Sequence, residues 1–235
     1  MKFIVEKEIF DKLENLYVGV VVAKGINNNK EYPSIDNMLD GSIALAEKEF
    51  MDKKVKEDEL IIPYREAFKS LEINPNKYLC SIEALFTRIA KGKGLPHINP
   101  LVNLNNAISL KYTLPMGTHD LTKSASDIEM RYANKNDTFI PMGTDTVEIP
   151  DENEVVYAVD NQIRTRRWTW RQSELGKIDE NTNYVFFPID GFQGFNDDKV
   201  NLAVQELQEK IKEIFNCEVV SGYVDKENNI FEWNL

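Results

Sequence analysis

The stretch Val155 to Gln172, VVYAVDNQIRTRRWTWRQ, is the part of the sequence that decides the fold. Val155 to Val159 and Gln162 to Trp170 are rich in β-branched and aromatic residues, which favour strands. Asp160 and Asn161 lie between these segments, and both residue types are typical of a tight turn between antiparallel strands. The stretch therefore predicts a β-hairpin in the middle of the chain.

Positive charge is concentrated in the segment Gln162 to Gln172, which contains the second strand of this hairpin. Four of the seven arginines and two of the three tryptophans of the chain lie here. Arginine beside tryptophan can bind phosphate and stack on a base or a ring, although a purely structural ladder of cation–π contacts is the alternative. Because side chains alternate along a strand, one face is expected to hold Gln162, Arg164, Arg166, Trp168 and Trp170, and the other Thr165, Arg167, Thr169 and Arg171.

The segments around the hairpin predict an α+β fold, with mixed β-sheets and helices packed on their faces. Apolar residues at helical spacing predict helices over residues 34–54, 81–91, 100–112 and from about 197 onward, with Ser34 and Ser81 as N-caps and Gly92 as a C-terminal stop. Further strands are expected over residues 17–24, 127–133, 138–141 and 184–189, followed by a terminal hairpin with residues 227–229 at its tip.

The composition limits the classes of function. The net charge of −11 argues against a non-specific nucleic-acid binder, but it allows a small basic patch on an acidic body. Cys80 and Cys217 are the only cysteines, so no disulfide framework is expected. The first residues, MKFIVEKEIF, are charged throughout, and no apolar run approaches the roughly 20 residues that span a bilayer. These features predict a soluble cytoplasmic protein without a membrane partner.

A second candidate segment is Leu95 to Asp120, LPHINPLVNLNNAISLKYTLPMGTHD. Asn103, Asn105 and Asn106 can cap the predicted helix or bind ligand atoms, and capping is the interpretation that the residues favour. The loop from Pro115 to Asp120 offers backbone N–H groups, a hydroxyl, an imidazole and a carboxylate, which can orient a water molecule, although histidine beside aspartate is also common on surfaces. Upstream, Lys91 and Lys93 fit the negative end of a helix dipole better than a phosphate site.

Other chemistries find little support in the sequence. His97 and His119 are the only histidines, and neither lies at a metal-ligand spacing with the cysteines. There is no Walker loop and no nucleophile elbow. We therefore expect no metal and no organic cofactor.

Three stretches together resemble a known family. LVNLNNAISLKYTLPMGTHDL (residues 101–121) is similar to the start of the B3/B4 region of the phenylalanyl-tRNA synthetase β subunit, with Asn106, Pro115 and Asp120 on the Asn, Pro and Asp of the family. VVYAVDNQIRTRRWTWRQSELGKIDENTNYVFFPIDGF (155–192) and KGKGLPHINPLV (91–102) resemble freestanding B3/B4 proteins. The resemblance covers residues 15 to 190 and implies a single B3/B4-like domain over residues 1–235, with N- and C-terminal extensions.

The resemblance implies an editing function. The synthetase domain removes wrongly attached tyrosine from its tRNA, and freestanding relatives resemble editing factors that act in trans. Two departures concern the pocket: Gly117 stands where the synthetase loop has histidine, with His119 two places later, and Trp168 to Arg171 replace a glycine-rich strand. Tyrosine specificity is therefore not carried over. By this resemblance, Asp190 corresponds to the acidic residue that recognises the tyrosine hydroxyl in the synthetase.

These arguments predict a trans-editing deacylase whose partner is a mischarged aminoacyl-tRNA carrying a polar or cationic amino acid or a non-protein analogue. A tRNA- or amino-acid-binding module without catalysis and a hydrolase of small amino-acid esters or amides are the alternatives. The predicted catalytic residues are Asn106, His119 and Asp120. The predicted substrate-binding residues are Pro115, Gly117, Thr118, Arg166, Arg167, Trp168, Trp170, Arg171, Gln172 and Asp190.

Overall fold

The valine-rich strand β2 (Leu16–Lys24) lies inside the protein because both of its faces are covered. In the computed structural model, which describes residues 1–124 and 126–235, eight of its nine residues are buried. Val18 and Val20 belong to one apolar core, whereas Val21 and Ala23 belong to a second core on the opposite face. Continuous burial explains why this strand is apolar throughout rather than alternating.

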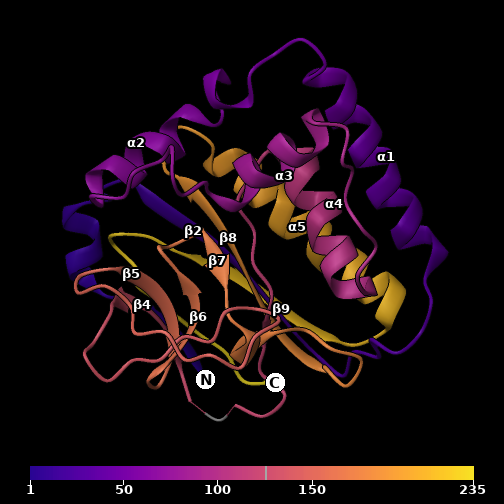
Figure 1. Ribbon diagram of the computed structural model, residues 1–235. Coiled ribbons are helices and arrows are strands. Elements are labelled where there is room, and N and C mark those ends of the chain that lie inside the picture. Colours follow the sequence, from indigo (N-terminus) through magenta and orange to yellow (C-terminus); the bar gives the residue numbers. More distant parts are fainter. Residues whose placement is uncertain (125) are drawn as a thin grey trace.

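Two sheets form the body of the described chain (Figure 1). A six-stranded sheet has the order β10-β1-β4-β5-β6-β7, and a four-stranded sheet has the order β3-β8-β2-β9. Strands β1 and β4 are parallel, and the other paired strands are antiparallel. Besides β2, the strands are β1 (Lys2–Val5), β3 (His119–Asp120), β4 (Ile128–Tyr132), β5 (Val155–Val159), β6 (Gln162–Arg166), β7 (Arg171–Gln172), β8 (Tyr184–Phe192), β9 (Glu218–Val224) and β10 (Ile230–Glu232).

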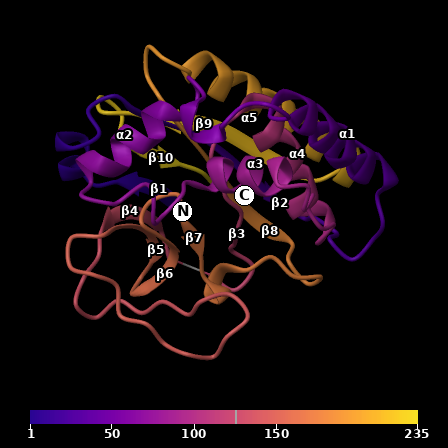
Figure 2. The same ribbon diagram turned by 45° about the horizontal axis from the view of Figure 1, so that its top comes forward.

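Helices cover the outer face of the four-stranded sheet (Figures 1 and 2). The second core lies between this sheet and helices α4 and α5, and Gly19 allows their close approach, because a Cβ there would lie 2.6 Å from a methyl group of Val200. The helices are α1 (Pro33–Glu49), α2 (Ile62–Ser70), α3 (Ser81–Ala90), α4 (Pro100–Tyr112) and α5 (Asp197–Phe215), with short 3-10 helices at Lys7–Asp11, Val55–Glu57 and Glu174–Gly176. These elements confirm the expected α+β class. No helix in the described part of the chain is long and apolar enough to cross a membrane.

Most of the predicted elements are present, with changes at their ends. Helix α1 begins at Pro33, with Tyr32 as N-cap, so the prediction of a Ser34 cap is wrong. Cys80 rather than Ser81 is the N-cap of α3. Residues 138–141 form isolated bridges instead of a strand. Helix α2 and the short strands β1 and β3 have too little periodic sequence to be predicted.

The expected strand from Gln162 to Trp170 is wrong beyond Arg166. Arg167 and Trp168 both adopt left-handed backbone conformations, with φ of 47° and 60°, and the chain turns back so that β7 pairs with β6. Such angles are costly for residues with large side chains. Hydrogen bonds hold the turn: the Trp168 N–H donates to the carbonyl of Val155 at 2.7 Å. The predicted alternation of faces therefore fails for residues 167–171.

The predicted terminal hairpin is also wrong, because its two strands pair with different sheets. Strand β9 pairs with β2, whereas β10 pairs with β1. The amino terminus of Met1 donates to the carbonyl of Trp233 at 3.0 Å, and Figure 1 shows the two ends of the chain side by side. The C-terminal segment thus connects the two sheets.

Candidate active site

A cavity of about 290 Å³ lies where helices α3 and α4 meet the edges of the two sheets. Its walls come from α3 and α4, from residues 116–119 beside the edge strand β3, from residues 168–172 in the turn between β6 and β7, and from Pro188 and Asp190 of β8. An enclosed apolar space of about 150 Å³ holds a benzene ring. The cavity therefore has room for an amino acid with a side chain of ring size.

The structure brings most of the predicted site residues together in this cavity. Nine of them line it: Asn106, Gly117, Thr118, His119, Trp168, Trp170, Arg171, Gln172 and Asp190. These residues come from two stretches of sequence and one strand, and the fold places them on facing walls. Four of the predicted residues, Pro115, Asp120, Arg166 and Arg167, do not line it.

Asp120 points away from the cavity because it follows His119 in the edge strand β3, where neighbouring side chains point to opposite faces. Its carboxylate accepts hydrogen bonds from the Thr122 N–H at 2.7 Å and the Thr182 hydroxyl at 3.1 Å. Pro115 contributes its carbonyl, which accepts from the Asp190 N–H at 2.9 Å. Both residues support the cavity wall, so the structure does not support a catalytic role for Asp120.

Arg166 and Arg167 do not form the expected phosphate-binding face. The guanidinium of Arg166 donates to both carboxylate oxygens of Glu154 at 2.8 Å and to Glu148 at 2.9 Å. Arg167 forms an ion pair with Asp151 at 2.6 Å and lies over the ring of Tyr78, 4.1 Å from its centroid. Acidic residues of the preceding loop therefore neutralise both cations. For Arg166 and Arg167 these contacts favour a structural role over phosphate binding.

Arg171 differs from its neighbours. It is exposed at the mouth of the cavity and forms no ion pair with any residue that the structure describes. Its guanidinium lies 5.9 Å from the ring centroid of Trp170. Arg164 is buried and likewise forms no ion pair with a described residue, and its guanidinium donates to the carbonyl of Leu175. Arg171 is thus the exposed unpaired cation of the cluster, at the entrance of the cavity.

Asp190 lies inside the cavity wall and is only 2% exposed. The Tyr157 hydroxyl and the Trp168 indole N–H both donate to its Oδ1 atom, each at 2.7 Å. Burial raises the pKa of Asp190 to about 7, and the two hydrogen bonds oppose this rise. No described residue donates to the second oxygen, Oδ2, so this atom is available to a ligand.

His119 is buried, and neither of its ring nitrogens has a hydrogen-bond partner among the described residues. Its ring packs near Tyr157 and Phe186, with centroids 5.7 and 5.9 Å away. Burial, with a smaller contribution from the charge of Arg164, lowers the pKa of His119 to about 3. The imidazole is therefore neutral at physiological pH, with one nitrogen able to donate and one able to accept.

Two further polar residues of the cavity were not assigned to the site from the sequence. The Asn105 Oδ1 atom and the Thr169 hydroxyl are buried, line the cavity and have no partner in the described chain. A signal for Asn105 exists in the sequence: it lies four residues after Leu101 and three before Ile108, on the apolar face of α4. Thr169 has no such signal, because its position depends on the left-handed turn before it.

The other asparagines of this region are structural. Asn99 is the N-cap of α4, and its side chain accepts from the Val102 N–H at 3.0 Å. Asn103 accepts from the Ile98 N–H and donates to Asp36 at 2.9 Å. The capping interpretation is thus wrong for Asn103, Asn105 and Asn106, because Asn99 is the N-cap, and Asn105 and Asn106 line the cavity.

Comparisons with known proteins agree with this architecture. Residues 63–216 match the B3/4 domain family, and because this is well over half of the chain, the protein belongs to that family. The fold is similar to that of an N-terminal fragment of the phenylalanyl-tRNA synthetase β subunit from Pyrococcus horikoshii, with a TM-score of 0.52 and 11% identity. The match covers 94% of this chain and 53% of that fragment, so the chain spans about half its length. Among curated proteins, no sequence matches this chain.

Proposed function

We propose that the protein is an aminoacyl-tRNA deacylase that acts in trans in the cytoplasm, hydrolysing the ester of a mischarged tRNA. One observation carries this proposal: within a B3/4 domain, three buried polar side chains without partners line one cavity of amino-acid size. Buried polar groups in proteins are almost always hydrogen-bonded. His119, Asn105 and Thr169 therefore fit a polar ligand that enters the cavity, and the name of the structural relative supports a tRNA ester as that ligand.

The cavity offers the groups that ester hydrolysis requires. An aminoacyl ester is already reactive, so the protein needs mainly to position water and to stabilise the developing oxyanion. Neutral His119 can hold a water molecule by accepting its hydrogen bond. With a pKa of about 3 it is a weak base, so its role is orientation, and the terminal ribose hydroxyl of the tRNA assists the proton transfer.

A backbone donor for the oxyanion is present beside His119. The Gly117 N–H donates to the carbonyl of Pro188 on β8 at 3.0 Å, so the next N–H, of Thr118, faces away from β8. No described residue accepts from the Thr118 N–H, while the Thr118 carbonyl is held by the Gln172 side chain. The peptide units on both sides of the Thr118 N–H are therefore held in place while this donor is free, as an oxyanion site requires. Asn106, half-buried at the cavity wall, is the second polar contact that we assign to the ester.

The side-chain end of the pocket favours a polar or cationic amino acid. The Oδ2 atom of Asp190, which has no described partner, is available to a ligand, and Trp168 also lines the cavity, fully buried. A carboxylate beside aromatic faces binds a hydrogen-bond donor or a cation. Arg171, which would repel a cation, is exposed at the mouth. Because the cavity has room for a ring, hydroxylated aromatic amino acids belong in the same test.

The experiment is deacylation of a panel of mischarged tRNAs that carry cationic, polar and aromatic amino acids, including non-protein analogues. We expect ester release from at least one cationic or polar member, and Asn106→Ala should slow this release without lowering the melting temperature. Asp120→Asn is the matched control, because Asp120 faces away from the cavity, and it should retain the rate per folded molecule. Binding of tRNA without ester release from any member would contradict the deacylase and support a binding module.

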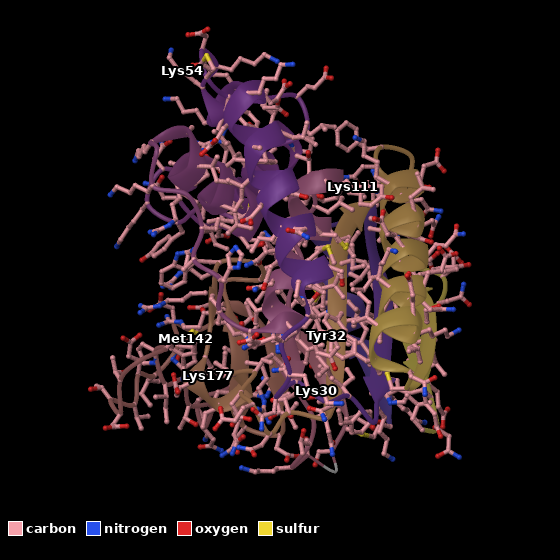
Figure 3. The ribbon with its side chains drawn as sticks, turned by 90° about the vertical axis from the view of Figure 1, so that its right-hand side faces the viewer. Lys30, Tyr32, Lys54, Lys111, Met142 and Lys177 are labelled. Carbon is pink, nitrogen blue, oxygen red and sulfur yellow. The ribbon has the colours of Figure 1, made fainter. Side chains whose placement is uncertain are left out.

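A hydrolase of small amino-acid esters is the second candidate, and the pairing of several cations with acids favours it. Lys54, Lys111 and Lys177 are well separated on the molecule (Figure 3), and each is paired with an acid, at 3.1, 2.7 and 2.9 Å. Together with the neutralised Arg166 and Arg167, they leave no track of free cations for a tRNA backbone among these residues. Competition by uncharged tRNA separates the two candidates, because a tRNA deacylase is inhibited and an esterase for small molecules is not.

A further inference from the structure

We propose that the cavity binds the free α-ammonium group of the aminoacyl ester through Asn105 and Thr169, and that the protein consequently rejects N-acylated esters. The inference rests on the proposed function and adds a requirement for an unblocked amine. The α-ammonium lies two bonds from the ester carbonyl carbon. It must therefore enter the cavity with the reacting group, whichever amino acid is attached.

Three side-chain donors of the cavity wall, those of Tyr157, Trp168 and Gln172, are already used by the protein. The Tyr157 hydroxyl and the Trp168 indole N–H both donate to Asp190. The Gln172 amide nitrogen donates to the carbonyls of Thr118 and Gly176. These groups cannot also donate to a ligand without breaking internal hydrogen bonds.

Acceptors remain in the interior. The Oδ1 atom of Asn105 is buried and accepts no hydrogen bond from any described residue, and the Thr169 hydroxyl, with two lone pairs, is equally without a partner. Apart from the Thr118 N–H and the His119 imidazole, which we assign to the ester and to water, further free N–H donors belong to half-buried Asn106 and exposed Arg171, toward solvent. The cavity thus has two unpaired acceptors inside and a cation at its mouth, which match a ligand with an ammonium group inside and an anionic phosphate outside.

An ammonium group has three donors and a charge, which buried acceptors satisfy. N-acylation removes the charge, leaves one N–H and adds bulk. Asn105 and Thr169 would then remain unpaired beside the ligand, and sites built on buried hydrogen bonds reject analogues that lack the matching group. Peptidyl, formyl and acetyl esters should therefore be excluded while free aminoacyl esters are accepted.

The test measures binding and hydrolysis separately. In the first arm, dissociation constants are measured for L-amino-acid amides with cationic, polar and aromatic side chains and for their N-acetyl forms. We expect acetylation to weaken the binding amides at least about tenfold. A smaller ratio, or no binding by any amide, overturns the proposal.

Variants of Asn105 and Thr169 test which of their atoms bind the ammonium group. Asn105→Asp keeps an acceptor oxygen and removes the amide donor, so it should retain amide binding, whereas Asn105→Leu and Thr169→Val should weaken it at least about tenfold. Loss of binding in Asn105→Asp equal to that in Asn105→Leu would show that Asn105 acts as a donor and would overturn the proposal. Because the apolar variants remove buried unpaired polar atoms, their melting temperatures should not fall, which separates a binding role from a structural one.

The second arm uses the mischarged tRNA with the fastest release, before and after chemical N-acetylation. Equal rates would refute the ammonium site and leave the deacylase standing. Discrimination among the amides without hydrolysis of any aminoacyl-tRNA would support the ammonium site and refute the deacylase.

Discussion

Replacing Asp190 with asparagine should remove a pH dependence of stability that the wild-type protein carries. Asp190 is buried, and both of its internal hydrogen bonds, from Tyr157 and Trp168, go to Oδ1. The asparagine oxygen can accept the same two bonds. The variant should therefore keep the fold while it loses the ionisable group.

The magnitude follows from the raised pKa. Burial raises the pKa of Asp190 from 3.8 to about 7 on folding. Between these two pH values the folded protein therefore holds a proton that the unfolded chain releases. The stabilisation is fully present below pH 3.8 and is lost as the pH rises through 7. At about 1.4 kcal/mol per pH unit, the total loss is about 4 kcal/mol, of which about 2–3 kcal/mol falls between about pH 5 and pH 8.

The assay is thermal or urea unfolding of wild type and Asp190→Asn across this pH range. A loss of about 2–3 kcal/mol corresponds to about 5–10 °C in melting temperature for a chain of this size, and it should appear in the difference between the two proteins. Tyr157→Phe is the matched variant: it removes one donor that lowers the pKa of Asp190, so the inflection should move to higher pH. Parallel curves for wild type and Asp190→Asn between about pH 5 and 8 would refute the reasoning.

Three other predictions concern residues around the cavity. Arg166→Met should destabilise the protein by about 3 kcal/mol in urea unfolding, because it leaves Glu154 buried without its main partner, and it should leave tRNA affinity per folded molecule unchanged. Since His119 stays neutral down to about pH 3, the deacylation rate of Asp190→Asn should show no histidine inflection between about pH 5 and 8, and an inflection there would contradict the neutral imidazole. In Gly117→Ala the new Cβ would lie 3.2 Å from Pro188 and 3.3 Å from the His119 ring. We therefore expect kcat to fall while KM changes less, and an unchanged kcat would argue against a role for His119 in orienting water.

The sequence could predict the features that depend on local pattern. The valine run of β2, the apolar stripes of α1, α3, α4 and α5, and the Asp160–Asn161 turn all appear near the predicted positions. The resemblance also selected nine residues that line one cavity. Short elements such as β1, β3 and α2 lacked enough periodic sequence to be recognised.

Only the tertiary structure decided which polar side chains are paired within the protein and which remain free to bind a ligand. Arg166 and Arg171 have the same chemistry and lie five residues apart, yet one is paired with Glu154 and the other is free at the cavity mouth. Asn103 and Asn105 lie on the same helix, yet only Asn105 has an unpaired buried atom in the cavity. Partners in these cases come from distant segments, and a left-handed turn re-aims Thr169. Local sequence specifies which elements form, because propensity and periodicity act over neighbouring residues, whereas hydrogen-bond partners and burial depend on how those elements pack.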